Sequence, residues 1–257
     1  MTRSTTMRRT TAASRLLVLA LAALAFAPAA ASAQLPDAQR ILARYIDALG
    51  GEAALRKHSF RYHKSTLSMP AQGITMSMEA FAAPPDLYVS RMEMPGMGTV
   101  RSGYDGKVAW TIHPATGPML LEGTALEQQR QQVNFYDPLD RDRYIKAMET
   151  LERTDFQGRS CYKVKVVTNW GEEYHEYYDT ETGLLAGLVR KQETPMGAIE
   201  STVIIDEYRE VGGVKLATKL RTLAMGMEQI VTVDSTSFEK FDTSVFDPPP
   251  EIKALVK

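Results

Sequence analysis

The sequence predicts a mainly β (α+β) protein built on one antiparallel sheet, and three observations support that fold class. From Ser59 onward, apolar and polar residues alternate with period two in segments of seven to eleven residues. Clusters of Pro, Gly, Asp and Asn separate these segments, as turns between antiparallel neighbours require. One amphipathic helix precedes the first segment. We expect about eleven strands in a single domain, residues 34–257, because no linker or repeat divides the chain.

The first 33 residues have the three-part layout of a cleavable secretory signal peptide. They contain four arginines and no acidic residue, then an apolar run from Leu16 to Phe26 and the triplet Ala31-Ser32-Ala33. This run is shorter than the roughly 20 residues that a membrane-spanning helix needs. We therefore expect cleavage after Ala33 and a soluble periplasmic protein without a transmembrane segment. The pair Arg8-Arg9 leaves the export route open.

The mature chain is expected to begin with a helix. Pro36-Asp37 is typical of a helix start, and Gly50-Gly51 of a helix end. Between them, apolar residues recur at steps of three and four: Ala38, Ile41, Leu42, Tyr45, Ile46 and Leu49. A short second helix or turn is expected at residues 52–57.

Strands are expected before and after a break in the middle of the chain. Asp105-Gly106 is the strongest hairpin signal among their connectors. The expected strands are residues 59–69, 73–81, 87–94, 98–104 and 107–113, then 149–156, 161–169, 172–179, 184–193, 199–208, 214–223 and 228–238.

The break itself contains good helix formers. Residues 122–134 are rich in Gln, Glu, Ala and Leu, which favours a helix, although a disordered loop is the alternative. Residues 138–148 suggest a further short helix that begins at Pro138.

Composition and motifs argue against several function classes. Removal of the leader takes the formal net charge from −1 to about −5, so nothing indicates a nucleic-acid partner. The single cysteine, Cys161, lies inside a predicted strand and cannot form an intramolecular disulfide. No serine lies in a G-x-S-x-G motif, and the four histidines are scattered. We therefore expect no cofactor, no metal site and no catalytic residue, although a hydrolase with dispersed residues such as His175 remains a third hypothesis.

The densest polar cluster, residues 172–176, does not converge on one point. On a strand, Glu173 and His175 share one face, while Glu172 and Glu176 point to the other. A solvated face is the preferred interpretation of this cluster.

The mature chain carries eleven methionines, and several fall on one side of neighbouring predicted strands. Methionine is flexible and polarizable, so a surface rich in it adapts to acyl chains or apolar peptides, although ordinary core filling is the alternative. The candidate lipid-binding residues are Ile74, Met76, Met78, Met92, Met94, Met225 and Met227, with Trp110, Tyr177 and Val203 as extensions of either a groove or a core.

Three stretches resemble the LolA-like family of periplasmic lipoprotein-sorting and lipid-binding proteins. Residues 83–89 (APPDLYV) resemble its Arg-Pro-x-x-aromatic strand entry, and residues 104–110 (YDGKVAW) resemble its D-G-K-x-x-W hairpin. Residues 245–249 (VFDPP) resemble its terminal F-x-x-P-P. The resemblance covers the chain from about Pro36 to Glu251.

This resemblance implies a strongly curved, unclosed antiparallel β-barrel whose concave side is covered by the N-terminal and mid-chain helices. It also implies a hydrophobic cavity that carries acyl chains of lipids or lipoproteins through the periplasm, between envelope proteins that act as donor and acceptor. In the lipoprotein carrier an arginine before the first proline-led strand ties the lid to the sheet. Pro84 stands at that place here, so the latch is expected to be missing or moved.

Two hypotheses about function follow. The first is a monomeric periplasmic carrier of lipid or acylated protein, related to outer-membrane lipoprotein sorting. The alternative is an accessory module that uses the same curved sheet to hold a protein partner in the envelope, without carrying lipid.

Overall fold

The computed structural model describes residues 1–2, 34–194 and 197–256, so the expected signal peptide lies almost wholly outside the described residues. Residues Leu35–Lys257 form one compact unit dominated by a single antiparallel sheet. Its strands are β1 (Arg61–Met69), β2 (Ile74–Ala83), β3 (Leu87–Met94), β4 (Gly98–Tyr104), β5 (Ala109–His113), β6 (Gly117–Leu121), β7 (Ile145–Phe156), β8 (Arg159–Thr168), β9 (Glu173–Asp179), β10 (Leu185–Thr194), β11 (Gly197–Val211), β12 (Val214–Ala224) and β13 (Met227–Ser237).

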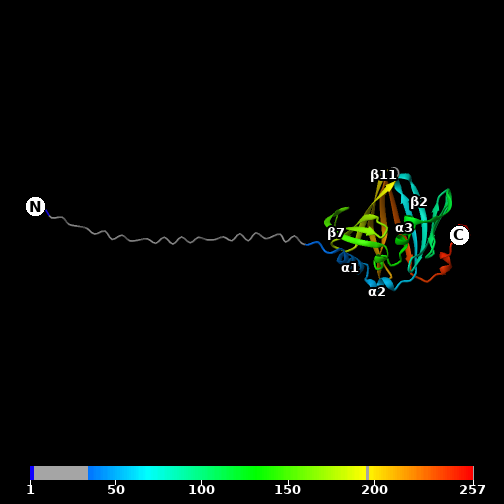
Figure 1. The fold of residues 1–257 in the computed structure, drawn as a ribbon, viewed down its shortest axis with the longest axis horizontal. Coiled ribbons are helices and arrows are strands. Elements are labelled where there is room, and N and C mark those ends of the chain that lie inside the picture. Colours follow the sequence, from blue (N-terminus) through cyan, green and yellow to red (C-terminus); the bar gives the residue numbers. More distant parts are fainter. Residues whose placement is uncertain (3–33, 195–196, 257) are drawn as a thin grey trace. The chain divides into compact units, whose positions relative to one another are not determined.

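The strand order explains why this sheet is not closed. The order is β6-β5-β4-β3-β2-β1-β13-β12-β11-β10-β9-β8-β7, so the first and last strands pair in the middle. The two edges, β6 and β7, are consecutive in the sequence but do not pair with each other. Two arms of a strongly curved sheet result, as expected for an unclosed barrel, and Figure 1 shows α3 between them.

Helix α1 (Ala38–Ala48) covers the arm formed by β7 to β10. It begins where Asp37 caps the chain by accepting a hydrogen bond from the backbone N–H of Gln39 at 2.8 Å. Its buried face packs against Val164, Val166, Tyr174 and Tyr178 of β8 and β9. A short helix, α2 (Glu52–Arg56), follows.

Gly50, between these two helices, is required by its surroundings. Its φ is +121°, and a Cβ there would lie 2.6 Å from the carbonyl oxygen of Gly213. The sharp turn brings the end of α1 against the start of β12, where Lys215 N–H donates to Leu49 O at 2.8 Å.

Residues 122–144, here called the covering segment, link the two edges of the sheet. They contain helix α3 (Gly123–Val133) and a single 3-10 turn, η2 (Arg141–Arg143). Leu126 and Val133 of α3 pack against Tyr104 and Ala109 on one arm. Gln131 Nε2 donates to Tyr174 Oη at 2.9 Å on the other arm. The glutamine-rich stretch is therefore a helix that bridges the arms rather than a disordered loop.

The two faces of the sheet are distinguished by what covers them. We call the face under α1 and α3 the inner face. The outer face of β2 to β6 is covered by the C-terminal 3-10 turn η3 (Thr243–Phe246) and helix α4 (Pro250–Lys253). Phe246 and Ile252 pack there against Trp110 and Val89.

Two expectations about secondary structure need correction. The sheet has thirteen strands rather than about eleven, and β6 matches none of the expected segments. Residues 138–148 do not form a helix, because β7 begins at Ile145 and pairs with β8. Ile145 and Met148 pack into the cluster under α1, and this tertiary packing overrides the local helix signal.

Candidate functional site

Apolar side chains lie on the inner face of both arms. We call this set the inner wall and define it as Leu67, Met76, Met78, Met92, Val203 and Val231. Residues paired across antiparallel strands share a face, and the register pairs Val231 with Leu67, Leu67 with Met76, and Met78 with Met92.

The inner wall is only partly covered by the protein itself. Met76 is buried, whereas Met78, Met92 and Val203 keep part of their surface exposed. At the upper rim, Ile74 and Met227 are 40% and 39% exposed. The wall therefore presents apolar surface that stays partly exposed in the described structure.

Seven of the ten sequence-predicted site residues lie on the inner face. By alternation and register they are Ile74, Met76, Met78, Met92, Met94, Val203 and Met227. The remaining three lie elsewhere. Trp110 belongs to the outer-face core under α4, and Tyr177 stacks on Phe156 on the outer face, with ring centroids 4.1 Å apart. Met225 lies in the turn between β12 and β13, 64% exposed with φ of +52°.

A buried ion pair ties the covering segment to the inner face. Arg141 and Glu176 are each 6% exposed, and Arg141 Nη1 donates to Glu176 Oε2 at 2.8 Å. Arg141 Nη1 also donates to Tyr178 Oη at 2.9 Å, and Tyr178 Oη donates to Glu176 Oε2 at 2.7 Å. Burial, reinforced by the Glu176 carboxylate, raises the pKa of Tyr178 well above its usual value, so the phenol keeps its proton.

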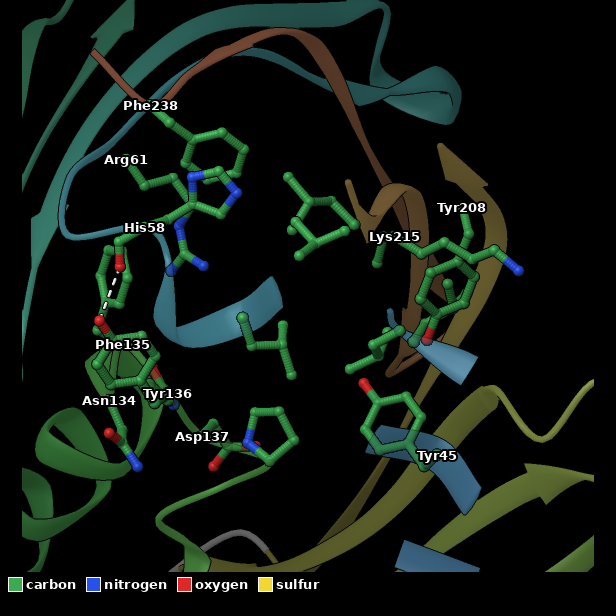
Figure 2. Close-up of a pocket in the computed structure, with 18 residues that line it drawn as sticks. Tyr45, His58, Arg61, Asn134, Phe135, Tyr136, Asp137, Tyr208, Lys215 and Phe238 are labelled. Atoms are coloured by element: carbon green, nitrogen blue, oxygen red, sulfur yellow. Dashed lines mark hydrogen bonds between the residues drawn. The ribbon is translucent and has the colours of Figure 1, made fainter. Parts of the chain in front are cut away.

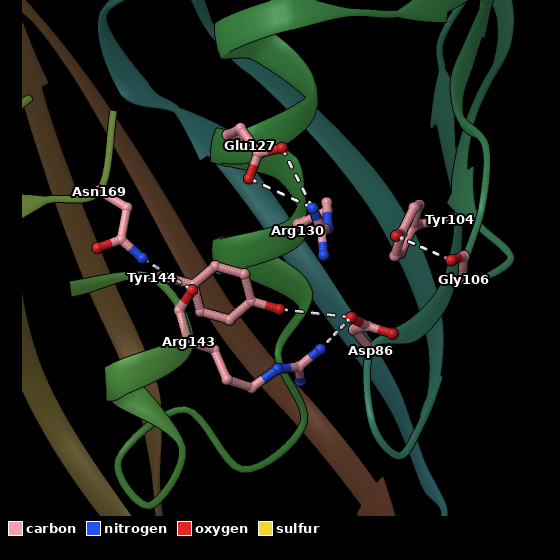
Figure 3. A network of polar contacts seen from close by, with 8 residues as sticks. All are labelled: Asp86, Tyr104, Gly106, Glu127, Arg130, Arg143, Tyr144 and Asn169. Carbon is pink, nitrogen blue, oxygen red and sulfur yellow. Dashed lines mark hydrogen bonds and ion pairs between the residues drawn. The ribbon is translucent and has the colours of Figure 1, made fainter. Parts of the chain in front are cut away.

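A second link joins the covering segment to the entry of β3. Asp86, 4% exposed, follows the cis Pro84-Pro85 bond and accepts from Arg143 Nη2 at 2.9 Å and from Tyr144 Oη at 3.4 Å. Figure 3 shows this carboxylate facing Arg143 and Tyr144. Pro84 itself forms no such tie; two arginines of the covering segment instead pair with Glu176 of β9 and with Asp86 in the turn before β3.

A cavity of about 260 Å³ lies at the lower end of the inner face. Its lining comes from α1 and α2, from the covering segment and from β1, β11 and β12 (Figure 2). Its charged and polar lining includes Arg61, Asn134, Asp137 and Lys215, and its apolar lining includes Leu49, Phe135, Ile205 and Val214. Sequence reasoning missed this cavity, because its walls come from segments more than 150 residues apart.

Cys161 and His175, the reactive groups that the sequence singled out, lie apart in the described structure. Cys161 is fully buried, and burial raises its thiol pKa to about 11, which makes it inert. His175 lies on the outer face beside Lys163 and Glu173, while Glu176 points inward, as the alternation predicted. Within the described residues, no group of His, Cys, Asp and Glu has the arrangement of a metal site. No helix in that part of the chain has the length and apolar character needed to cross a membrane.

No protein-family model and no curated protein matches the sequence. Solved structures do match. One is a DUF1329 family protein from Desulfovibrio piger, with a TM-score of 0.57 and 9% identity over 81% of this chain and 96% of the other. Another is a LolA superfamily protein from Nitrosomonas europaea, with a TM-score of 0.55 and 12% identity over 83% and 99%.

A third match is described as an outer membrane lipoprotein-sorting protein domain from Vibrio parahaemolyticus, with a TM-score of 0.53 and 11% identity over 82% and 94%. Identities this low bear on fold alone. Together with the unclosed, strongly curved antiparallel sheet and its covering helices, these likenesses show that the chain has a LolA-like fold.

Proposed function

We propose that this protein is a periplasmic carrier that binds acyl chains of lipids or lipoproteins against its inner wall. The observation that supports the proposal most is the partly uncovered apolar surface on the inner face, where Met78 of β2 lies opposite Met92 of β3. Burial of each methylene group is favourable by about 0.8 kcal/mol, so ten buried methylenes supply about 8 kcal/mol before binding costs are subtracted. Methionine side chains adapt to guests of varied shape.

Carriage of an acyl chain needs no chemical step. A dry apolar wall and a cover that shields the guest from water are sufficient. The covering segment supplies such a cover, since Arg141 and Arg143 attach it to the inner face and to the entry of β3. The cargo, the periplasmic location and the monomeric state are parts of the proposal.

The direct test is binding of a fluorescent fatty acid to protein purified without detergent, together with native mass spectrometry of the same preparation. We expect co-purified lipid and a saturable fluorescence change. Met78→Asp combined with Met92→Asp places two carboxylates on the wall and is expected to weaken binding at least tenfold, because a charge resists transfer to an apolar site.

Met97→Asp is the matched control, since Met97 is 54% exposed in the turn after β3. We expect its binding to stay within twofold of the unmodified protein. A lipid-free mass together with no fluorescence response in the unmodified protein would contradict the proposal. Recovery of one stoichiometric protein partner and no lipid would instead favour the accessory-module hypothesis.

A further inference from the structure

The cavity at the lower end of the inner face is lined by an arginine that forms no ion pair with any described residue. Arg61, at the start of β1, lines this cavity, and its Nε is buried without a hydrogen-bond partner. Among the described residues, none forms an ion pair or hydrogen bond with its guanidinium. The guanidinium instead lies over the ring of Phe135, whose centroid is 4.9 Å from Cζ.

A guanidinium in this position favours an anion. Arginine stays charged at neutral pH, so the desolvation of Arg61 is not relieved by loss of its proton. An unpaired, partly buried charge is costly, and a bound carboxylate or phosphate would offset that cost through short charge-assisted hydrogen bonds.

Asn134 provides the second, independent observation. Its side chain is 4% exposed, lines the same cavity, and leaves both Oδ1 and Nδ2 without a partner within the described structure. Buried amides are normally hydrogen-bonded, so an unsatisfied pair beside a cavity indicates a ligand that supplies an acceptor for Nδ2. Figure 2 shows Arg61 and Asn134 among the residues around the cavity, with Phe135 and Tyr136 between them in this view.

Asp137 also lines this cavity, but it does not neutralise Arg61. The charges that act most strongly on its carboxyl group are those of Arg141, Glu176, Arg190 and Asp140, and Arg61 is not among them. Burial raises the pKa of Asp137.

The inner wall leads directly to this cation. Along β1 the inner-face positions run from Leu67 through Ser65 and His63 to Arg61. Their partners on β2 change from Met76 and Met78 to the small residues Ala80 and Ala82. The six residue steps from Leu67 to Arg61 span about 20 Å, so an extended acyl chain that lies along β1 from the inner wall can place its head group at Arg61.

We propose that this cavity is an anion subsite, in which Arg61 and Asn134 hold the carboxylate or phosphate of an amphiphile whose acyl chain lies along the inner wall. This inference rests on the proposed carrier function and adds a charge requirement to it. A neutral amphiphile with the same acyl chain would contact the inner wall but gain nothing from Arg61.

Calorimetric titration with oleate, oleoyl lysophosphatidate and oleyl alcohol tests the charge requirement, because the three share one chain and differ in the head group. In the unmodified protein we expect at least one of the anions to bind at least tenfold more tightly than the alcohol. Tighter binding of oleate would identify a carboxylate site, and tighter binding of lysophosphatidate a phosphate site.

Variants then assign the preference to Arg61. Arg61→Gln is expected to weaken anion binding at least tenfold and to change alcohol binding less than threefold, whereas Arg61→Lys retains part of the anion preference. Arg91→Gln, an exposed position on the outer face of β3, is the control and is expected to leave all three affinities unchanged. Thermal unfolding confirms that each variant is folded.

The outcomes separate the two proposals. If all three ligands bind the unmodified protein with equal affinity, the anion subsite is overturned and the carrier function stands, and this comparison needs no variant. Arg61→Gln binding the anions as tightly as the unmodified protein would also overturn the subsite. If none of the three binds, the carrier function itself fails.

Discussion

Removal of Arg141 should destabilise the protein more than removal of any surface arginine. Arg141→Met leaves Glu176 buried at 6% exposure with its charge uncompensated, although Tyr178 still donates to it. Breaking a buried pair by removal of one partner costs about 3–5 kcal/mol. For a protein of this size, each kcal/mol lowers the unfolding temperature by about 2–4 °C, so we expect a decrease of about 6–20 °C, measured by circular dichroism.

Two further variants separate the buried charge from the loss of packing. Arg141→Met combined with Glu176→Leu removes both charges and is expected to recover most of the lost stability, since buried pairs are replaceable by apolar residues. Arg209→Met breaks an exposed pair with Glu207 and should lower the unfolding temperature far less, because solvent screens that pair. A decrease for Arg141→Met no larger than that for Arg209→Met would refute the reasoning.

Three other predictions concern the core and its titration. Gly103→Ala places a Cβ 2.5 Å from the ring of Trp110, so we expect a loss of about 1–3 kcal/mol in urea unfolding and a change in tryptophan emission; an unchanged midpoint would contradict the contact. Cys161 should resist thiol reagents in the native protein and react only after unfolding, as followed by mass spectrometry. Burial and the nearby Arg61 lower the pKa of His63 to about 4, below an ordinary value near 6.5. Neutral His63 therefore contributes fully to the free energy of unfolding above about pH 6.5, and this contribution decreases as the pH falls toward 4, because the unfolded chain binds the proton first. The difference in the free energy of unfolding between the unmodified protein and His63→Gln, measured by urea titration, should narrow over that range.

The sequence predicted the sheet well because alternation and turn residues are local signals. All twelve expected strand segments lie in the sheet, and α1 begins directly after Pro36-Asp37, the predicted helix start. Strand β6 was not predicted, because it has only five residues and contains Pro118. Proline is tolerated at a sheet edge, but it weakens the strand pattern in the sequence.

The candidate site was harder to predict. The alternation of apolar and polar residues shows which residues of a strand share a face, but it does not show which face of the sheet is the inner one. Trp110 is apolar and alternates correctly, but the outer face of its strand is also covered, by α4. The pairing of Arg141 with Glu176 joins residues 35 positions apart. The cavity around Arg61 brings β1 together with β12, and no local pattern encodes that approach.

The place where the sheet is joined has a consequence for the chain as a whole. The ladder between β1 and β13 connects the two arms, and each arm is a series of hairpins. No strand pairing passes through α3, so a single protease cut within α3 would leave every ladder intact and produce two fragments that remain associated in native buffer. The covering segment shields the inner face, while the strands alone hold the sheet together. The covering segment can therefore vary in length without a change in the sheet.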